Sequence, residues 1–248
     1  MSGRTGTDDS AARETILARV REALRVPAPL PHLASHAPPT SPGPGGRPGL
    51  TILPALAGRP WLPDGGESPE ESLGILAENL ERLKAKLFRV PDAAAAADCL
   101  FARGRERDWR RVAFHAHPVV EPLLAGLSSA TYRVDGPGES CDKDALEACD
   151  AGVTSCECLV AQTGSILVSS QSGGRGLSIL PHCHVVIATL DQVVPTLADA
   201  LELARARHAG RLPSMLSFIT GPSRTGDIER ILVLGAHGPK ELIVILVG

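Results

Sequence analysis

The residues best suited to chemistry lie in a polar segment between two apolar runs near the end of the chain. The first run ends at Thr220, and Ser223, two residues beyond Gly221, has the character of a helix N-cap. A strand that leads into a glycine and then a cap residue leaves several backbone N–H groups unpaired at one point, which suits an anion or a polar ligand. An Arg224–Asp227 pair with only a structural role is the alternative. The candidate binding residues of this segment are Gly221, Ser223, Arg224, Thr225 and Asp227.

A second group of candidate residues lies upstream. The loop 170–178 carries one guanidinium, that of Arg175, among glycines and serines. Arg175 could bind a carboxylate or phosphate through two parallel N–H bonds, or it could pair with a nearby acid. Thr163 and Gly164 form a tight turn between two apolar runs. We expect three loops to converge at the carboxyl ends of their strands and to share one anion site: 162–164, 170–178 and 220–227.

The histidines offer one candidate for acid–base chemistry. His237 lies in a glycine-rich loop and could orient a ligand or move a proton, or it could be a buried, hydrogen-bonded histidine. His182 and His184 flank Cys183, and on a strand the two rings would point to one side and the thiol to the other. No histidine–carboxylate spacing typical of zinc sites occurs, so we expect no metal in this chain.

The positions of the apolar residues indicate alternating strands and helices that would place these loops. Ser68-Pro69-Glu70-Glu71 has the pattern of a helix capping box, and leucines follow at helical spacing. Further helices are expected at 91–103, 118–127, 143–149 and 190–208. Strands are expected at 111–115, 130–134, 157–161, 165–169, 184–189, 215–220, 231–235 and 241–247, the last two as a hairpin or as adjacent edge strands. This alternation predicts an α/β fold with a mainly parallel sheet and helices on both faces.

The N-terminal quarter has a different composition. Residues 9–26 indicate a short amphipathic helix, and residues 27–63 are rich in proline and glycine, as in an extended, poorly ordered linker. We therefore divide the chain into a disordered tail with one helix, residues 1–66, and a folded domain, residues 67–248. The tail either has no catalytic role or carries a docking helix for a partner subunit.

Composition excludes several classes of function. Aromatic residues make up 3% of the chain and the net charge is −3, so neither base stacking nor phosphate neutralisation is favoured and no nucleic acid is expected. No apolar run is long enough to span a bilayer and the N-terminus lacks the apolar core of a signal peptide, so we expect a cytoplasmic protein. The six cysteines are scattered and lack the CxxCxxC spacing of ferredoxins. We expect reduced thiols and no cofactor in this chain.

Two strings carry a family resemblance: TGPSRTGDIE with VLGAHGP in residues 217–239, and AQTGSILVSSQSGGRGLSILPHCHVVIATLDQVVPTL at 161–197. They resemble the lactate-utilisation protein C family, whose module is the LUD domain. The resemblance implies a phosphosugar-isomerase/CoA-transferase-like fold. Such folds can use a glutamate nucleophile, but no family motif places one at Glu157. The neighbouring cysteines, Cys156 and Cys158, are interpreted as core residues.

The same resemblance implies a function. It suggests a cytoplasmic, cluster-free subunit of a system that oxidises L-lactate to pyruvate, with iron–sulfur clusters on separate partner subunits and a small carboxylate or other anion as ligand. Two alternatives stay open. One is a stand-alone enzyme that acts on a phosphorylated or acyl-CoA substrate, and the other is a non-catalytic scaffold for the iron–sulfur partners.

Overall fold

The chain divides into two units, residues 1–59 and 60–248. The computed structural model describes residues 8–23, 63–134, 142–171, 174–225, 233–234 and 238–248. In the first unit it describes one helix, α1 (Asp8–Ala23), on which Ile16 is 62% exposed. The predicted linker lies almost wholly outside the described residues, and the domain boundary at residue 67 stays a prediction.

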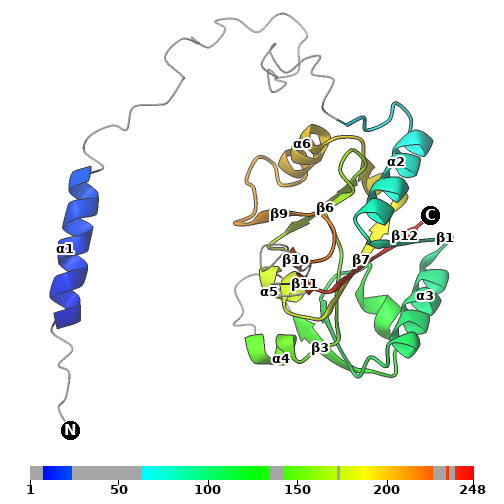
Figure 1. Cartoon of the computed structure of the whole chain (residues 1–248), viewed down its shortest axis with the longest axis horizontal. Coiled ribbons are helices and arrows are strands. Elements are labelled where there is room, and N and C mark those ends of the chain that lie inside the picture. Colours follow the sequence, from blue (N-terminus) through cyan, green and yellow to red (C-terminus); the bar gives the residue numbers. More distant parts are fainter. Residues whose placement is uncertain (1–7, 24–62, 135–141, 172–173, 226–232, 235–237) are drawn as a thin grey trace, which may run out of the picture. The chain divides into compact units, whose positions relative to one another are not determined.

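The second unit is built on a six-stranded sheet in the order β1-β12-β7-β4-β2-β3, and every pairing within it is parallel (Figure 1). The interior residues of the long central strands are buried, which is typical of a parallel sheet covered on both faces. Its strands are β1 (Lys86–Val90), β2 (Arg111–His115), β3 (Ala130–Val134), β4 (Ala151–Thr154), β7 (Cys183–Thr189) and β12 (Glu241–Val247).

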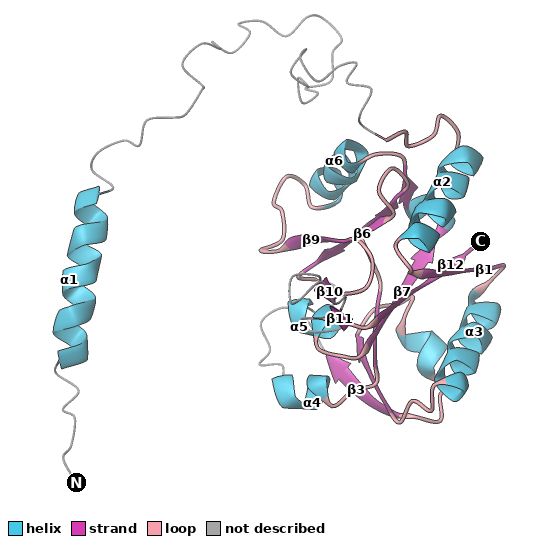
Figure 2. Cartoon of the chain, in the orientation of Figure 1, coloured by secondary structure: helices cyan, strands magenta, loops and turns pink. Residues whose placement is uncertain are grey.

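Both faces of this sheet are covered, as Figure 2 shows in helix and strand colours. One face packs against α3 (Ala93–Glu106) and the 3₁₀ turn η1 (Glu121–Leu124) through a core that includes Leu100 and Ile245. The other face packs against α2 (Pro69–Arg82), α4 (Lys143–Glu147) and α5 (Gly174–Ile179). The predicted α/β class, with a mainly parallel sheet and helices on both faces, is therefore confirmed.

A smaller sheet of four strands, in the order β8-β5-β6-β9, also covers the second face. Its β5–β6 and β6–β9 pairings are antiparallel, and α6 packs on its outer side through Ala200 and Ala204. The elements are β5 (Cys158–Val160), β6 (Ser165–Ser169), β8 (Val193–Val194), β9 (Leu216–Ile219) and α6 (Leu197–Arg207), and a further two-stranded pair is β10 (Arg224–Thr225) with β11 (Val233–Leu234).

The predicted start of the first helix of the second unit is confirmed. The hydroxyl of Ser68 accepts the backbone N–H of Glu71, and Pro69 occupies the first helical position. The carboxylate of Glu71 reaches back to the N–H of Glu67, 2.8 Å away. These bonds satisfy N–H groups that the first helical turn cannot pair internally.

Two predicted helices are wrong in extent. Residues 118–127 form only the short turn η1. In the segment 190–208 the Thr189–Gln192 capping box exists but closes only a 3₁₀ turn, η2 (Leu190–Gln192). Val193 and Val194 then pair with β5, and α6 begins after a second capping box at Thr196. Strand pairing of the two valines, with Pro195 behind them, outweighs the helical periodicity.

Two predictions near the C-terminus are also wrong. β12 was expected at an edge but lies between β1 and β7, because its apolar run ELIVILV is buried on both faces. Ser223 was expected to begin a helix, yet Arg224 and Thr225 form β10. The backbone N–H of Ser223 donates to the carbonyl of Pro239 rather than facing a ligand.

Candidate functional site

The carboxyl ends of β2, β4 and β7 open onto a cavity of about 460 Å³. Ligands of open α/β sheets bind at this edge, since the loops that leave the strands there diverge and leave a crevice. The lining comes from 117–119 after β2, 155–157 after β4, Gln171 after β6, 187–192 around the end of β7, and 207–208 at the end of α6.

Glu157 is a buried carboxylate in the wall of this cavity. Its Oε2 lies 2.8 Å from Nη1 of Arg207, and its Oε1 lies 3.1 Å from Nε2 of His208. Burial raises the pKa of Glu157, but hydrogen bonds from Ser169, Arg207 and His208 outweigh burial and hold the pKa below its usual value. The carboxylate is therefore ionised at neutral pH and both of its oxygens are engaged.

The end of α6 positions the partners of Glu157. Thr196 and Asp199 cap the start of the helix, and Ala200 and Ala204 pack on the smaller sheet. Arg207 is the last of the eleven residues of α6 and lies beside the start of β5, where its Nη1 also donates to the backbone carbonyl of Glu157 at 2.8 Å. Two acceptors of one residue thus fix the orientation of the guanidinium.

His115 and Ser155 form a second polar pair behind the cavity wall. The backbone N–H of Ser155 donates to Nε2 of His115 at 3.0 Å, and the hydroxyl of Ser155 lies 3.0 Å from the same nitrogen. Burial, assisted by the neighbouring His117, lowers the pKa of His115 to about 4. The ring is therefore neutral at pH 7, and its Nε2 is an acceptor that orients Ser155.

His117, two residues after His115, lines the cavity. Its Nδ1 accepts the backbone N–H of Val119 at 3.2 Å, so the hydrogen of the neutral ring is on Nε2. Burial lowers the pKa of His117 and Arg207 lowers it further, whereas Glu157 acts in the opposite direction. The rings of His117 and His115 have centroids 5.2 Å apart. The cavity therefore combines the neutral imidazole of His117, the hydroxyl of Ser155 and the anchored guanidinium of Arg207.

Residues 130–247, which contribute most of the cavity wall, match the LUD domain. This part of the chain is similar to the LUD domain family. The resemblance inferred from the sequence is thereby confirmed. A protein of Bacillus subtilis (strain 168) named "Lactate utilization protein C" is 38% identical over 114 residues, which are 45% of this chain and 47% of that protein. The chain thus spans about half the length of that relative.

Two further similarities extend over more of the chain. "Lactate utilization protein C" of Bacillus licheniformis is 26% identical over 201 residues, which cover 73% of this chain and 80% of that protein. A crystal structure of a DUF162 family protein from Deinococcus radiodurans superposes with a TM-score of 0.57 at 24% identity, covering 74% of this chain and all of the other. This structural similarity supports the α/β fold.

The predicted turn residues of the LUD domain take part in structural contacts. The hydroxyl of Thr163 donates to Ser165, whose hydroxyl lies 2.8 Å from that of Thr220. Gly164 has a φ of +65° and a Cβ at this position would lie 2.9 Å from the Cβ of Asn79. Two of the predicted loops, 162–164 and 220–221, therefore do meet, and they meet against the end of α2.

Most predicted binding residues after Thr220 also lie near the end of α2. Gly221 has a φ of +89° and packs beside Leu83, and a guanidinium N–H of Arg224 donates to the carbonyl of Leu83. Thr225 pairs with Val233 in the short β10–β11 ladder. Asp227 and His237 lie outside the described residues, and ligand binding by any of these positions stays a prediction.

Arg175 is the second residue of α5 and is exposed. We expected its loop and the 220–227 loop at one edge because both follow apolar strands. The two loops do not leave the sheet at one edge, because β6 and β9 are antiparallel: Ile166 pairs with Ile219, and Ser169 pairs with Leu216. The two strands therefore end at opposite edges of the smaller sheet. A single anion bound by both loops stays a prediction without this support.

The cavity residues were largely missed by sequence reasoning, although one signal was available. His115 and His117 stand at the end of the correctly predicted strand 111–115, where an α/β fold places its ligands. Glu157 was considered only as a nucleophile. Arg207 and His208 resemble an ordinary basic helix end. Among the described residues no three His, Cys, Asp or Glu side chains gather as a metal site, and Cys99, Cys156, Cys158 and Cys183 are free thiols.

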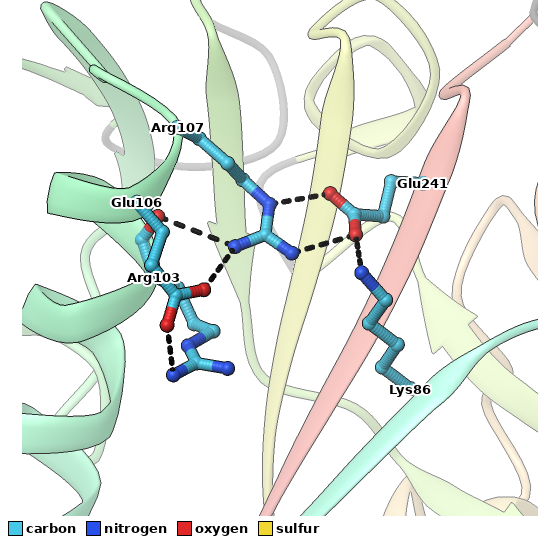
Figure 3. A network of polar contacts seen from close by, with 5 residues as sticks. All are labelled: Lys86, Arg103, Glu106, Arg107 and Glu241. Carbon is cyan, nitrogen blue, oxygen red and sulfur yellow. Dashed lines mark hydrogen bonds and ion pairs between the residues drawn. The ribbon is translucent and has the colours of Figure 1, made fainter.

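The opposite, amino edge of the six-stranded sheet carries a second arginine–carboxylate group (Figure 3). Glu241 at the start of β12 accepts two bonds from Arg107, at 2.6 and 2.7 Å, and one from Lys86 at 2.5 Å. Hydrogen bonding from Arg107 lowers the pKa of Glu241 to about 2, against the effect of burial. Glu106 and Arg103 extend the network on α3.

Proposed function

We propose that this protein takes part in lactate utilisation, as the cytoplasmic, cluster-free subunit of a system that oxidises L-lactate to pyruvate. In this proposal the iron–sulfur clusters belong to partner subunits. The observation that carries the proposal is the LUD domain at 130–247 together with relatives that are named "Lactate utilization protein C". The absence of ferredoxin-type cysteine spacing in the sequence accords with a subunit that carries no cluster.

Growth tests the proposal directly. A strain of the source organism that lacks this gene should grow normally on glucose and fail to grow, or grow several-fold more slowly, on L-lactate as the sole carbon source. The full-length chain supplied in trans should restore growth. Equal growth of the deletion and parent strains on L-lactate, together with equal lactate oxidation in their extracts, would contradict the proposed function.

The partner assignment needs a separate experiment. Affinity purification of the tagged full-length protein from lactate-grown cells, carried out anaerobically, should recover proteins with cysteine motifs for iron–sulfur clusters. Iron content and visible absorption should follow those partners and be absent from fractions that contain this chain alone. Recovery of the chain alone from lactate-grown cells would argue against the complex.

A stand-alone enzyme on an acyl-CoA is the second candidate, and the location of Glu157 in the cavity is the observation that favours it. For attack on an acyl group the carboxylate would first have to leave Arg207 and His208, which occupy both of its oxygens. We therefore prefer the subunit role. Native mass spectrometry of the purified protein separates the two, because a retained CoA or phosphorylated metabolite would favour the enzyme.

Within the described part of the chain no helix is both long enough and apolar enough to cross a membrane.

A further inference from the structure

The guanidinium of Arg207 combines a fixed position with unused donors. Its Nη1 is held by the carboxylate and the backbone carbonyl of Glu157, both at 2.8 Å. Among the residues that the structure describes, Nε and Nη2 of Arg207 have no partner. The Arg207 side chain is 40% exposed, whereas that of Glu157 is 7% exposed. An arginine anchored on one nitrogen can present its remaining N–H groups to a ligand without first losing side-chain freedom.

Glu157 is the positioning residue of this arrangement. Because His208 and Ser169 also bind its carboxylate, the group that orients Arg207 is itself held from three sides. Its charge balances that of Arg207, so the arginine can line a half-enclosed cavity without an uncompensated charge. Glu157 therefore orients Arg207, and the guanidinium of Arg207 makes the contact with the ligand.

His117 supplies a second donor on the same cavity. With Nδ1 occupied by the N–H of Val119, its Nε2–H is the group available to a ligand. Arg207 affects the titration of His117, which places the two side chains within electrostatic range of each other. A guanidinium and an imidazole N–H that line the same cavity are a suitable pair of donors for the two oxygens of a carboxylate.

The other residues that line the cavity favour a singly charged carboxylate over a phosphate. Glu157 and Asp191 are acids on the same cavity, so a doubly charged phosphate would be repelled more strongly than a singly charged carboxylate. Val119 and Ile187 add apolar surface that suits a short alkyl group. The hydroxyl of Ser155, paired with His115, can hydrogen-bond an oxygen at the carbon next to the carboxylate.

We propose that the cavity at the carboxyl edge of the six-stranded sheet binds a small monocarboxylate, with Arg207 as its principal contact and His117 as the second donor. The choice of L-lactate or pyruvate as that carboxylate rests on the proposed function. Binding of a small carboxylate at Arg207 rests only on the cavity. This site differs from the predicted one at Arg175 and the 220–227 loop, and the two make opposite predictions for single variants.

Calorimetric and saturation-transfer NMR titrations of the full-length protein with L-lactate, pyruvate, acetate and inorganic phosphate test the site. The carboxylates should bind more tightly than phosphate. Arg207→Lys keeps the charge beside Glu157 but loses the planar fork, and should weaken carboxylate binding about tenfold or more. Arg205→Lys, on the exposed side of the same helix, and Arg175→Lys, at the predicted site, should bind within twofold of the wild type.

His117→Gln provides an independent variant in case Arg207→Lys lowers stability, because His117 is only half-buried. It should weaken binding several-fold while the thermal unfolding midpoint stays near that of the wild type. Wild-type affinity in both Arg207→Lys and His117→Gln would overturn the proposal. So would loss of binding in Arg175→Lys alone, or tighter binding of phosphate than of every carboxylate.

Failure of this inference can be separated from failure of the proposed function. If deletion abolishes growth on L-lactate but no carboxylate binds at the cavity, the site is refuted and the function is retained. If acetate or pyruvate binds through Arg207 while deletion leaves growth on L-lactate intact, the site is supported and the lactate assignment is lost.

Discussion

The two edges of the six-stranded sheet each hold a carboxylate bound by an arginine. The two arginines differ in how many of their N–H donors stay unpaired. At the amino edge Arg107 binds Glu241 through two nitrogens and Glu106 through the third. At the carboxyl edge Arg207 uses only Nη1 for Glu157 and borders a cavity of about 460 Å³. Every nitrogen of the first guanidinium is engaged by the protein, whereas Nε and Nη2 of the second have no partner among the described residues.

This difference separates a structural ion pair from a candidate binding group better than residue type does. Both pairs have short distances and a carboxylate whose pKa lies below its usual range. Neither criterion distinguishes them, since structural networks perturb pKa values as readily as active sites do. The number of unsatisfied donors that face a cavity does distinguish them, and this number depends on where the strands end.

The largest effect that we expect at the amino edge is on stability. Glu241→Ala leaves Arg107 and Lys86 without their common partner, and the side chains of Arg107 and Glu241 are only 20% and 24% exposed. The free energy of unfolding in urea should fall by about 2–4 kcal/mol, while carboxylate affinity stays at the wild-type value. Glu78→Ala, which breaks an exposed pair with Arg82, is the control and should scarcely change stability. A large loss of ligand affinity in Glu241→Ala would break the comparison.

The same carboxylate should make stability depend on acid pH. The pKa of Glu241 is lowered from 4.5 to about 2 in the folded protein. A lowered pKa contributes stability above the unfolded value, and this contribution is lost as the pH falls from about 4.5 to about 2, at most about 3 kcal/mol. Urea denaturation between pH 6 and pH 2 should therefore show a shallower acid loss for Glu241→Gln than for the wild type. Parallel curves would mean that the pair contributes nothing specific.

Gly164→Ala tests whether the predicted loop 162–164 is structural. Its φ of +65° disfavours a side chain, and the added Cβ would meet Asn79 at 2.9 Å. Stability should fall by about 1–3 kcal/mol. Gly210→Ala is the matched control, because Gly210 has a φ of +76° but no atom within 4 Å of the added Cβ. It should lose less than Gly164→Ala, and the difference measures the contact with α2 alone.

The smallest effect that we expect is on the titration of one histidine, His115, and not on stability. The pKa of His115 is lowered to about 4, mainly by burial. In an NMR titration of ring protons, the His115 signal should not move between pH 7.5 and about 5, whereas in urea-denatured protein it should titrate near 6.5. Titration near 6.5 in the folded protein would show that the His115 ring is open to water and not buried behind the cavity wall.

The local sequence pattern was sufficient to predict those elements whose location depends mainly on their own residues. The strands 111–115, 130–134 and 165–169 have the predicted bounds, and the cap at Ser68 forms as expected. In each case the residue pattern within a few positions is enough to locate the element, although the strands themselves pair with distant residues. The family strings supported the LUD domain in the same way, since they are contiguous in the sequence.

Long-range pairing accounts for the predictions that were wrong. Val193 and Val194 have helical spacing but pair with Leu159 and Val160, more than 30 positions away. β12 resembles a terminal edge strand by its place in the chain, yet it inserts between β1 and β7. The direction of β9 relative to β6 decided that Arg175 and the 220–227 loop do not follow the same edge.

The sequence by itself determined the fold class, the family resemblance and the positions of most strands, because hydrophobic periodicity, cap residues and contiguous motifs act over a few neighbouring positions. Only the tertiary structure decided which polar side chains meet. Glu157 and Arg207 are 50 positions apart and become partners because α6 packs on β5, and His115 reaches Ser155 because β2 and β4 are adjacent parallel strands. A binding site built from strand ends therefore depends on the order and direction of strands, which no single segment encodes.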